Sequence, residues 1–473
     1  MINMEGKIKI GLETHVQLNT RTKLFCGCSL EKLSEAEPNA RTCETCLGMP
    51  GSKPRLNKGA VEVGIKIATA LGCKLPAKMF FSRKIYLYPD MSKNFQITQY
   101  EIPIASAGAV ESVDETGKRK IVEISRMNLE EDPAKIQHVG GNITTARYTL
   151  IDYNRSGVPL CEIVTAPIFK SPREARIYLQ RLMAILRYIN AFVEDEFALK
   201  TDANISIEGG ERVEVKNITG FREVEKALAY EIVRQRSLVR KGEKISQETR
   251  TWDADAKVTR PLRKKETAED YGYIFEPDLR MIALQKEWIE KIRKNLPELP
   301  HQKAERYQKN FKLSKELAAA LTSDLEVAQS FESAAKKEDP QLCARWVELL
   351  RKTLFHNDIS LAETKLKLEQ FLELLHLVKK KSLEPRAAEM ILREIIFTPD
   401  KFDSLVKKYS KLSEKNISEI IAKVLRDEKS AVAAYKSGDK KVLDFLIGQV
   451  QKASDLRTDA KVVKTLIKKK LAG

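Results

Sequence analysis

The distribution of glycine constrains the fold of this chain more than any other feature of its sequence. Glycines and prolines punctuate the first three hundred residues, whereas no glycine lies between Leu296 and Ser437. The glycine-free part is rich in Lys, Glu, Leu and Ala and shows helical periodicity, as in ETKLKLEQFLELLHLV. The sequence therefore predicts a mixed N-terminal part and an all-helical remainder, and 473 residues are too many for one core.

Short β-favouring segments separated by turn residues fill the first part. We expect strands over residues 7–12, 84–88, 95–100, 121–125, 148–153, 161–165, 204–207 and 212–218, and helices over 57–71, 171–189 and 221–239. The two glycines between Ile207 and Arg212 favour a hairpin. Ser171 is the expected N-cap of its helix, with Pro172 at the first helical position and Glu174 completing a capping box.

Strands and helices are mixed in the first part but do not alternate strictly, so the predicted fold class is α+β with a mainly antiparallel sheet. The prolines of LPELPHQK mark a linker near residue 296, and a second break falls near residues 397–404. We predict three domains, over 1–294, 295–403 and 404–473, of which the last two are all-helical.

The charge balance bears on partners. Lys and Arg outnumber Asp and Glu by 83 to 66, which favours a nucleic-acid partner, although a solvated lysine-rich surface would give the same balance. No apolar run reaches membrane-spanning length, and the N-terminal residues lack the apolar segment of a secretory signal. Seven cysteines, four of them clustered, favour a reducing compartment. We therefore expect a cytoplasmic protein with no membrane partner.

Four cysteines have the spacing of metal ligands. Cys26 and Cys28 are separated by one residue, Cys43 and Cys46 by two, and fourteen residues lie between the pairs. Four thiolates suit tetrahedral zinc, and a closed shell of four protein ligands indicates a structural site. The alternative is a set of buried cysteines with coincidental spacing.

Acidic and amide residues recur at alternate positions of the expected strands, so that each pair shares a face. These pairs are Glu13/His15, Asp152/Asn154, Asp202/Asn204 and Glu214/Lys216, and Glu130, Glu131 and Asp132 follow one another. Inward-facing carboxylates are costly unless they bind a cation such as Mg²⁺. Arg126, Arg155, Lys200 and Lys216 could neutralise substrate phosphates. A solvated polar face is the alternative for any single pair. The chain has no GxxxxGK[ST] phosphate loop and no GxGxxG motif.

Several runs together resemble one family. They are GLETHVQLNTRTKLFC, ETCLGMPGSKPRLNKGAVE, YPDMSKNFQITQYEIPI, LEEDPAKIQH, DYNRSGVPLCEIV, TDANISI, EVKNITGFREVEKALAYEIVRQ and QETRTWD. These runs resemble the B subunits of the tRNA-dependent aspartyl/glutamyl amidotransferases, the GatB/GatE family. The similarity is dense to about Leu279 and is clear again in YKSGDKKVLDFLIGQVQKA.

The resemblance implies a cradle-shaped kinase domain related to glutamine synthetase, a helical domain, and a small YqeY-like helical tail, the last two contacting tRNA. It implies a carbon–nitrogen ligase that amidates Glu-tRNA(Gln) and/or Asp-tRNA(Asn). ATP and Mg²⁺ would serve to phosphorylate the side-chain carboxyl, and ammonia would displace the phosphate. The implied partners are the charged tRNA and the A and C subunits of the amidotransferase. The former is an amidase (glutaminase) that makes the ammonia, and the latter is a small protein that braces the pair.

The same resemblance assigns metal and catalytic roles to Glu13, His15, Glu130 and Glu131. Further candidates are Asp202, Asn204 and Glu214. Of these residues, Glu13, His15 and Glu131 are the expected Mg²⁺ ligands, and His15 could instead face ammonia as a base or be a satisfied core histidine. A second hypothesis is a non-catalytic, zinc-containing RNA-binding protein. Under the first hypothesis, Glu131→Gln abolishes amidation and spares tRNA binding.

Overall fold

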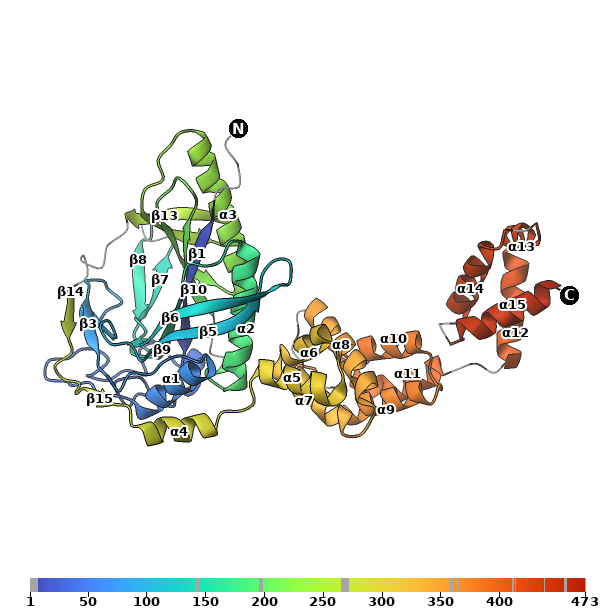
Figure 1. Cartoon of the computed structure of the whole chain (residues 1–473), viewed down its shortest axis with the longest axis horizontal. Helices are drawn as coiled ribbons and strands as arrows, with labels where there is room; N and C mark the ends of the chain where they lie inside the picture. The colour runs from blue at the N-terminus through green and yellow to red at the C-terminus, as the bar shows by residue number, and fades with distance from the viewer. Residues whose placement is uncertain are drawn as a thin grey trace. The chain divides into compact units, whose positions relative to one another are not determined.

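The structure is a computed structural model that describes residues 7–140, 145–194, 199–264, 272–357, 359, 361, 363–364, 366–410, 412, 414–437, 439–454 and 457–472. The chain divides into two compact units, Met1–Leu299 and Pro300–Gly473. Figure 1 shows that the first unit mixes strands and helices and that the second is helical. None of the helices within the described ranges is long and apolar enough to cross a membrane.

Strands dominate the first unit. Its strands are β1 (Lys9–Gln17), β2 (Lys78–Met79), β3 (Ser82–Ile85), β4 (Phe95–Thr98), β5 (Ala105–Val113), β6 (Arg119–Glu131), β7 (Lys135–Val139), β8 (Tyr148–Asp152), β9 (Pro159–Thr165), β10 (Lys200–Ser206), β11 (Val213–Thr219), β12 (Glu248–Asp253), β13 (Val258–Lys264), β14 (Gly272–Phe275) and β15 (Ile282–Ala283). Its helices are η1 (Leu33–Glu35), α1 (Lys58–Ala70), α2 (Pro172–Tyr188), α3 (Phe221–Arg240) and α4 (Lys286–Lys294).

Eight strands form one large sheet in the order β13-β12-β11-β10-β1-β9-β6-β5. Every neighbouring pair is antiparallel except β11 and β12, which are parallel. Three small sheets accompany it: β14-β3-β4, β15-β2 and the hairpin β7-β8. In the view of Figure 1, α2 and α3 lie on one side of the large sheet, and β3, β14 and the β7-β8 hairpin lie on the other. The predicted mixed fold with a mainly antiparallel sheet is confirmed.

The helix caps follow the sequence closely. The Asn57 side chain accepts hydrogen bonds from the N–H groups of Gly59 and Ala60 and so caps α1. Ser171 caps α2 by accepting from the Glu174 N–H at 3.3 Å. The predicted capping box is only half formed, because the Glu174 carboxylate accepts from the Lys170 N–H at 2.9 Å. The same carboxylate oxygen pairs with Lys120 at 2.6 Å, so its position is decided by a tertiary contact.

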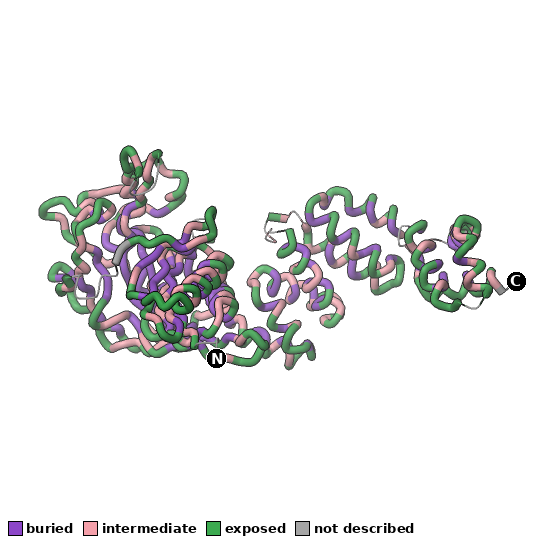
Figure 2. Tube along the Cα trace, turned by 90° about the horizontal axis from the view of Figure 1, so that it is seen from above, coloured by how far each residue is buried: buried purple, intermediate pink, exposed green. Residues whose placement is uncertain are grey.

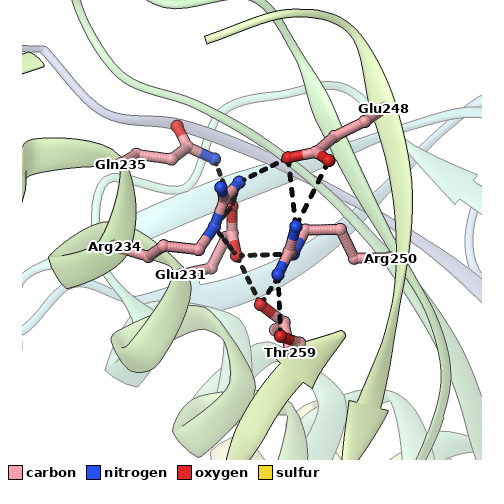
Figure 3. Close-up of polar contacts among 6 residues, drawn as sticks. All are labelled: Glu231, Arg234, Gln235, Glu248, Arg250 and Thr259. Carbon is pink, nitrogen blue, oxygen red and sulfur yellow. Dashed lines mark hydrogen bonds and ion pairs between the residues drawn. The ribbon is translucent and has the colours of Figure 1, made fainter. Parts of the chain in front are cut away.

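A buried charge network joins α3 to the edge of the large sheet (Figure 3). Glu231, which is fully buried, accepts from Arg234 and Gln235 on its own helix and from the Thr259 hydroxyl on β13. In a second layer, Glu248 on β12 accepts from Arg234 at 2.8 Å and from Arg250 at 3.2 Å. The network therefore fixes β12 and β13 against α3.

The second unit is built of helices with one apolar side each (Figure 2). Its elements are α5 (Pro300–Phe311), α6 (Lys315–Thr322), α7 (Leu325–Ala335), α8 (Pro340–His356), α9 (Leu368–Lys379), α10 (Pro385–Ile395), η4 (Pro399–Lys401), α11 (Phe402–Tyr409), α12 (Glu414–Asp427), α13 (Lys429–Lys436), α14 (Val442–Ala453) and α15 (Ala460–Ala472). Two separate cores form, one running from Ala304 to Tyr409 and the other from Ile417 to Ile467.

The cores place the predicted domain boundaries more finely. Leu299 packs in the core of the first unit, five residues beyond the predicted end at residue 294. The predicted boundary at 403/404 falls inside α11, whose Phe402, Leu405 and Tyr409 belong to the core that begins at Ala304. The chain can therefore be divided after Ser410 without cutting that core.

Every predicted strand segment overlaps an observed strand, and the GG spacer joins the antiparallel pair β10-β11. Three strands of the large sheet, β5, β12 and β13, have no predicted counterpart. Strand β5 has the sequence ASAGAVESV, in which small residues give little intrinsic preference for a strand. Its eight paired positions with β6 show that tertiary pairing decides its conformation.

Candidate active site

Strand β1 lies in the middle of the large sheet, and its register brings acidic residues of its neighbours together. Glu13 is paired with Asp202 on β10, and His15 is paired with Glu162 on β9 and with Lys200 on β10. Because paired residues in adjacent strands point to the same face, these side chains line one face of the sheet. The intervening Leu12 and Val16 point into the core below.

One group of potential metal ligands consists of His15, Glu130 and Glu162, whose ligand atoms lie within 4.8 Å of one another. Nε2 of His15 is 3.5 Å from a carboxylate oxygen of Glu130. The Thr98 hydroxyl donates to Glu130 at 3.1 Å, and the amide of Asn128 donates to Glu162 at 3.2 Å. These contacts hold both carboxylates toward His15.

A second group consists of Glu13, Asp202 and Glu214, again within 4.8 Å of one another. The amide of Asn204 donates to Glu13 at 3.3 Å. Lys216 forms ion pairs of 2.9 Å with both Asp202 and Glu214. A single ammonium thus balances two of the three carboxylates.

The charges of the two groups influence each other. Burial raises the pKa of Glu13, and the carboxylates of Glu162 and Asp202 raise it further. Burial also raises the pKa values of Glu130 and Glu162. For His15, burial acts to lower the pKa, but the carboxylates led by Glu130 outweigh it and the pKa is raised. The two groups therefore hold more negative charge than the nearby protein cations neutralise.

Other pKa shifts show where the cations act. Burial acts to raise the pKa of Asp202, but the charge of Lys216 outweighs it and the pKa is lowered. The pKa of Lys216 is raised, because Asp202 and Glu214 outweigh the effect of its burial. Lys200 has a lowered pKa, owing chiefly to burial.

The residues present fit a hard divalent cation. Carboxylate oxygens dominate both groups, and Mg²⁺ prefers oxygen ligands. The Oδ1 atoms of Asn128 and Asn204 are buried and accept no hydrogen bond from any described residue. Each of these oxygens belongs to an amide that contacts one of the two groups, through Glu162 and Glu13 respectively. A bound cation or its water would satisfy both.

The predicted phosphate-binding residues differ in their surroundings. Arg126 is 3.9 Å from Glu162 and its side chain is 45% exposed, so its guanidinium can meet a ligand. Arg155 is held by Asp132 at 3.4 Å and donates to the carbonyls of Pro133 and Ala134. Its guanidinium therefore fixes the turn after β6. Lys200 lies beside Asp202 and Arg155 in the electrostatic neighbourhood of the groups.

Glu131 does not join either group. Both of its carboxylate oxygens contact Nζ of Lys93, at 2.5 and 2.6 Å, and one accepts from the Ile97 N–H at 2.8 Å. Neighbouring residues of a strand point to opposite faces, which separates Glu131 from Glu130. The predicted role of Glu131 as a Mg²⁺ ligand stays a prediction, and its ligand oxygens are already engaged.

The sequence analysis missed several residues at this site. Glu162 is the most important, and its one signal is a single carboxylate inside the otherwise apolar β9. The small sheet β14-β3-β4 adds Lys84, whose charge acts to lower the pKa values of Glu130 and Glu162. It also adds Tyr273, whose pKa rises to about 12 through burial and the charge of Glu162. Only tertiary structure brings this sheet over the carboxylates.

The four predicted cysteines come together. The sulfur atoms of Cys26, Cys28, Cys43 and Cys46 lie within 4.8 Å of one another and form no disulfide. Zn–S bonds of about 2.3 Å in a tetrahedron place sulfurs roughly 3.8 Å apart, so a modest contraction would close the site. The pKa of Cys46 is lowered to about 4, first by a hydrogen bond from Cys26. These donors suit a soft or borderline cation such as Zn²⁺.

Comparisons with known proteins identify the family. Residues 8–290 match the family described as the GatB/GatE catalytic domain, and residues 329–471 match the GatB domain. The chain is 42% identical over 475 residues to a protein of Saccharolobus solfataricus (98% of this chain and 99% of that protein). It is 41% identical over 496 residues to a protein of Methanosarcina barkeri (100% and 99%) and 41% identical over 483 residues to one of Haloquadratum walsbyi (98% and 96%).

All three relatives are named as B subunits of aspartyl/glutamyl-tRNA(Asn/Gln) amidotransferase. The match to the catalytic domain covers the strands that bring the two carboxylate groups together. The similarity extends over nearly the whole length of both partners in each comparison. The chain belongs to the GatB/GatE family of amidotransferase B subunits.

Proposed function

We propose that this chain is the subunit that amidates misacylated tRNA, converting Glu-tRNA(Gln) and/or Asp-tRNA(Asn) to the amide at the expense of ATP. The observation that carries the proposal is the pair of adjoining carboxylate groups around Glu13 and His15. The names of the full-length relatives supply the substrate class. In its fold, the proposal treats the first unit as a cradle-shaped domain related to glutamine synthetase.

The two groups would hold Mg²⁺, which would screen the phosphates of ATP and polarise the transferring phosphoryl group. His15, Glu130 and Glu162 would bind it on one side, and Glu13, Asp202 and Glu214 on the other. Arg126, which is half-exposed at the edge, would neutralise phosphate oxygens. The side-chain carboxyl of the aminoacyl group would receive the phosphoryl group, and ammonia would then displace phosphate.

Lys216 has a positioning role in this proposal. Its ammonium holds Asp202 and Glu214 at 2.9 Å each, so their oxygens are aimed before a cation arrives. Desolvation of the site protects the activated carboxyl from water, which is the competing nucleophile. The ammonia would come from a partner glutaminase, and a small third protein would complete a heterotrimer.

The second unit would contact tRNA. Between Leu405 and Gly473, Lys and Arg outnumber Asp and Glu by 17 to 8, which favours binding to the phosphate backbone. The cysteine cluster would hold a structural Zn²⁺ that closes the loop between β1 and α1. Elemental analysis should find about one zinc per chain, and Cys43→Ser/Cys46→Ser should lose it.

The decisive experiment reconstitutes the full complex with its glutaminase and its small third protein and supplies each charged tRNA. Amidated tRNA should form only with ATP, Mg²⁺ and a nitrogen donor together. Tight tRNA binding with no amidation under any of these conditions would favour the alternative of a non-catalytic, zinc-containing RNA-binding protein.

A further inference from the structure

Lys23 is a fully buried lysine beside the four cysteines. Its Nζ lies 3.5 Å from Sγ of Cys46 and donates to the Tyr153 carbonyl at 3.1 Å. Burying an ammonium costs several kcal/mol unless a negative charge compensates it. Among the described residues, Lys23 forms no ion pair with a carboxylate, so the thiolate of Cys46 is the negative charge that it meets.

The charge of a four-cysteine metal site explains why a cation is buried here. Four thiolates around one divalent ion have a net charge of about −2. Such a centre is costly in a dry environment, and groups that hydrogen-bond to its ligands tune its affinity. An ammonium touching one sulfur reduces the net charge of the assembly and occupies one lone pair of that thiolate.

The backbone around Cys46 is tied to two turns at the edge of the large sheet. The Cys46 carbonyl accepts from the hydroxyls of Ser92 at 2.7 Å and Ser156 at 3.2 Å. The following residue of one turn, Lys93, pairs with Glu131. The preceding residue of the other, Arg155, fixes the turn after β6.

The turn after β8 closes directly over Lys23. The Leu24 N–H donates to the Gly157 carbonyl at 2.8 Å. Gly157 has a φ of 88°, and a Cβ there would meet the Lys23 side chain at 3.4 Å and Cβ of Cys46 at 3.7 Å. Lys23 therefore spans the distance between a metal ligand and the turn that leads into β9, the strand of Glu162.

We propose that Lys23 is the counter-cation of the four-cysteine metal site and that it couples metal binding to the position of the turn from Tyr153 to Gly157. The inference rests on the proposed metal site and not on amidation. Loss of zinc binding with normal amidation, or the reverse, would therefore tell the two apart.

The first test measures metal affinity in the full chain. Zn²⁺ and Co²⁺ are titrated in competition with a chelator into the unaltered protein, Lys23→Met and Lys23→Arg. Lys23→Met should lower the affinity about 10- to 100-fold, as loss of an outer ligand contact usually does, whereas Lys23→Arg should lower it less. The Co²⁺ absorption of a four-thiolate site should persist in both variants. Equal affinity in all three proteins would overturn the proposal.

Lys303→Met is the matched control, because Lys303 is also buried but pairs with Glu332 in the helical unit. It should leave the metal affinity unchanged. If it lowers the affinity as much as Lys23→Met does, the effect is general destabilisation and the proposal fails.

The second test follows the turn by hydrogen exchange and needs no variant that might fail to fold. Removing the metal from the unaltered protein should accelerate exchange in peptides covering residues 153–158 and leave those covering 105–113 of β5 unchanged. In Lys23→Met, the 153–158 peptides should exchange quickly even with metal bound. Protection of this turn that is indifferent to metal would refute the coupling.

Discussion

Nε2 of His15 lies 3.5 Å from a carboxylate oxygen of Glu130, across two strands that are not neighbours in the sheet. Strand β9 separates them, and it contributes Glu162 to the same group. A metal ligand set is thus assembled from three adjacent strands, of which the central one supplies the residue that sequence reasoning missed.

Replacing Glu130 by Gln should abolish amidation. The substitution keeps the shape of the side chain and the contact with Thr98, but it removes a charged oxygen from the His15 group. Loss of one preorganised electrostatic contact typically lowers kcat by about 100-fold or more. The assay is ATP-dependent amidation by the reconstituted complex, with tRNA affinity measured alongside.

Glu123→Gln is the matched control, since Glu123 is an exposed residue of the same strand. It should retain full activity. Normal turnover of Glu130→Gln would contradict the assignment of this group. A comparison with Glu131→Gln separates the two neighbours, because that change breaks the ion pair with Lys93 instead.

The affinity for Mg²⁺ should rise with pH. In the metal-free protein the pKa values of Glu13, Glu130 and Glu162 are raised above the usual 4.5, chiefly by burial, and that of His15 is raised above 6.5 by the surrounding carboxylates. These groups hold protons at a pH where exposed ones would not, and Mg²⁺ must displace them. Binding should therefore release protons, increasingly so as the pH falls from neutrality.

The same shifts give the sign of the stability change without metal. A raised folded-state pKa stabilises below the unfolded value, and this contribution is lost as the pH rises through the folded value. The metal-free protein should thus lose stability above about pH 4.5 through these carboxyls, and Mg²⁺ should restore it. Calorimetric titration in buffers of different ionisation enthalpy measures the protons released. A heat that is independent of the buffer at all pH values would contradict the prediction.

Much of this architecture follows from local sequence signals. The caps at Asn57 and Ser171 and the hairpin at Gly209–Gly210 depend on residues close in sequence, and each is found where expected. Alternation along a strand predicts which of its residues share a face, as for Glu13 and His15. What it cannot predict is which strands become neighbours.

Strand pairing decides the composition of the site. Glu13 meets Asp202 because β1 pairs with β10, although the two strands are far apart in sequence. Lys84 approaches Glu130 because a separate small sheet lies beside β6. Both relationships depend on long-range packing, which leaves no periodic trace in the sequence. Glu131 shows the reverse case, where adjacency in sequence suggested a shared role and the strand geometry directs it to Lys93.

Replacing Glu231 by Gln should destabilise the first unit strongly. This buried carboxylate meets the guanidinium groups of Arg234 and Arg250 (Figure 3). Removing one member of a buried ion pair leaves uncompensated charge and typically costs about 3–5 kcal/mol. Urea unfolding monitored by tryptophan fluorescence measures the change, because Trp252 lies on β12 beside the network.

Lys226→Gln on the same helix provides the comparison. Lys226 is exposed and pairs only with Glu223 one turn away among the described contacts. Its removal should change the free energy of unfolding by less than about 1 kcal/mol. Equal effects of the two substitutions would mean that the network adds no more than a surface ion pair.

Deleting the last helices should weaken tRNA binding in a salt-dependent way. A truncation after Ser410 keeps α11 and its core intact and removes the separate core from Ile417 to Ile467 with its excess of basic residues. Contacts between lysines and phosphates release counterions, so the slope of log affinity against log salt should become shallower in the truncated protein. Filter binding of charged tRNA at several salt concentrations measures both quantities. An unchanged slope with unchanged affinity would show that α12 to α15 do not bind the tRNA backbone.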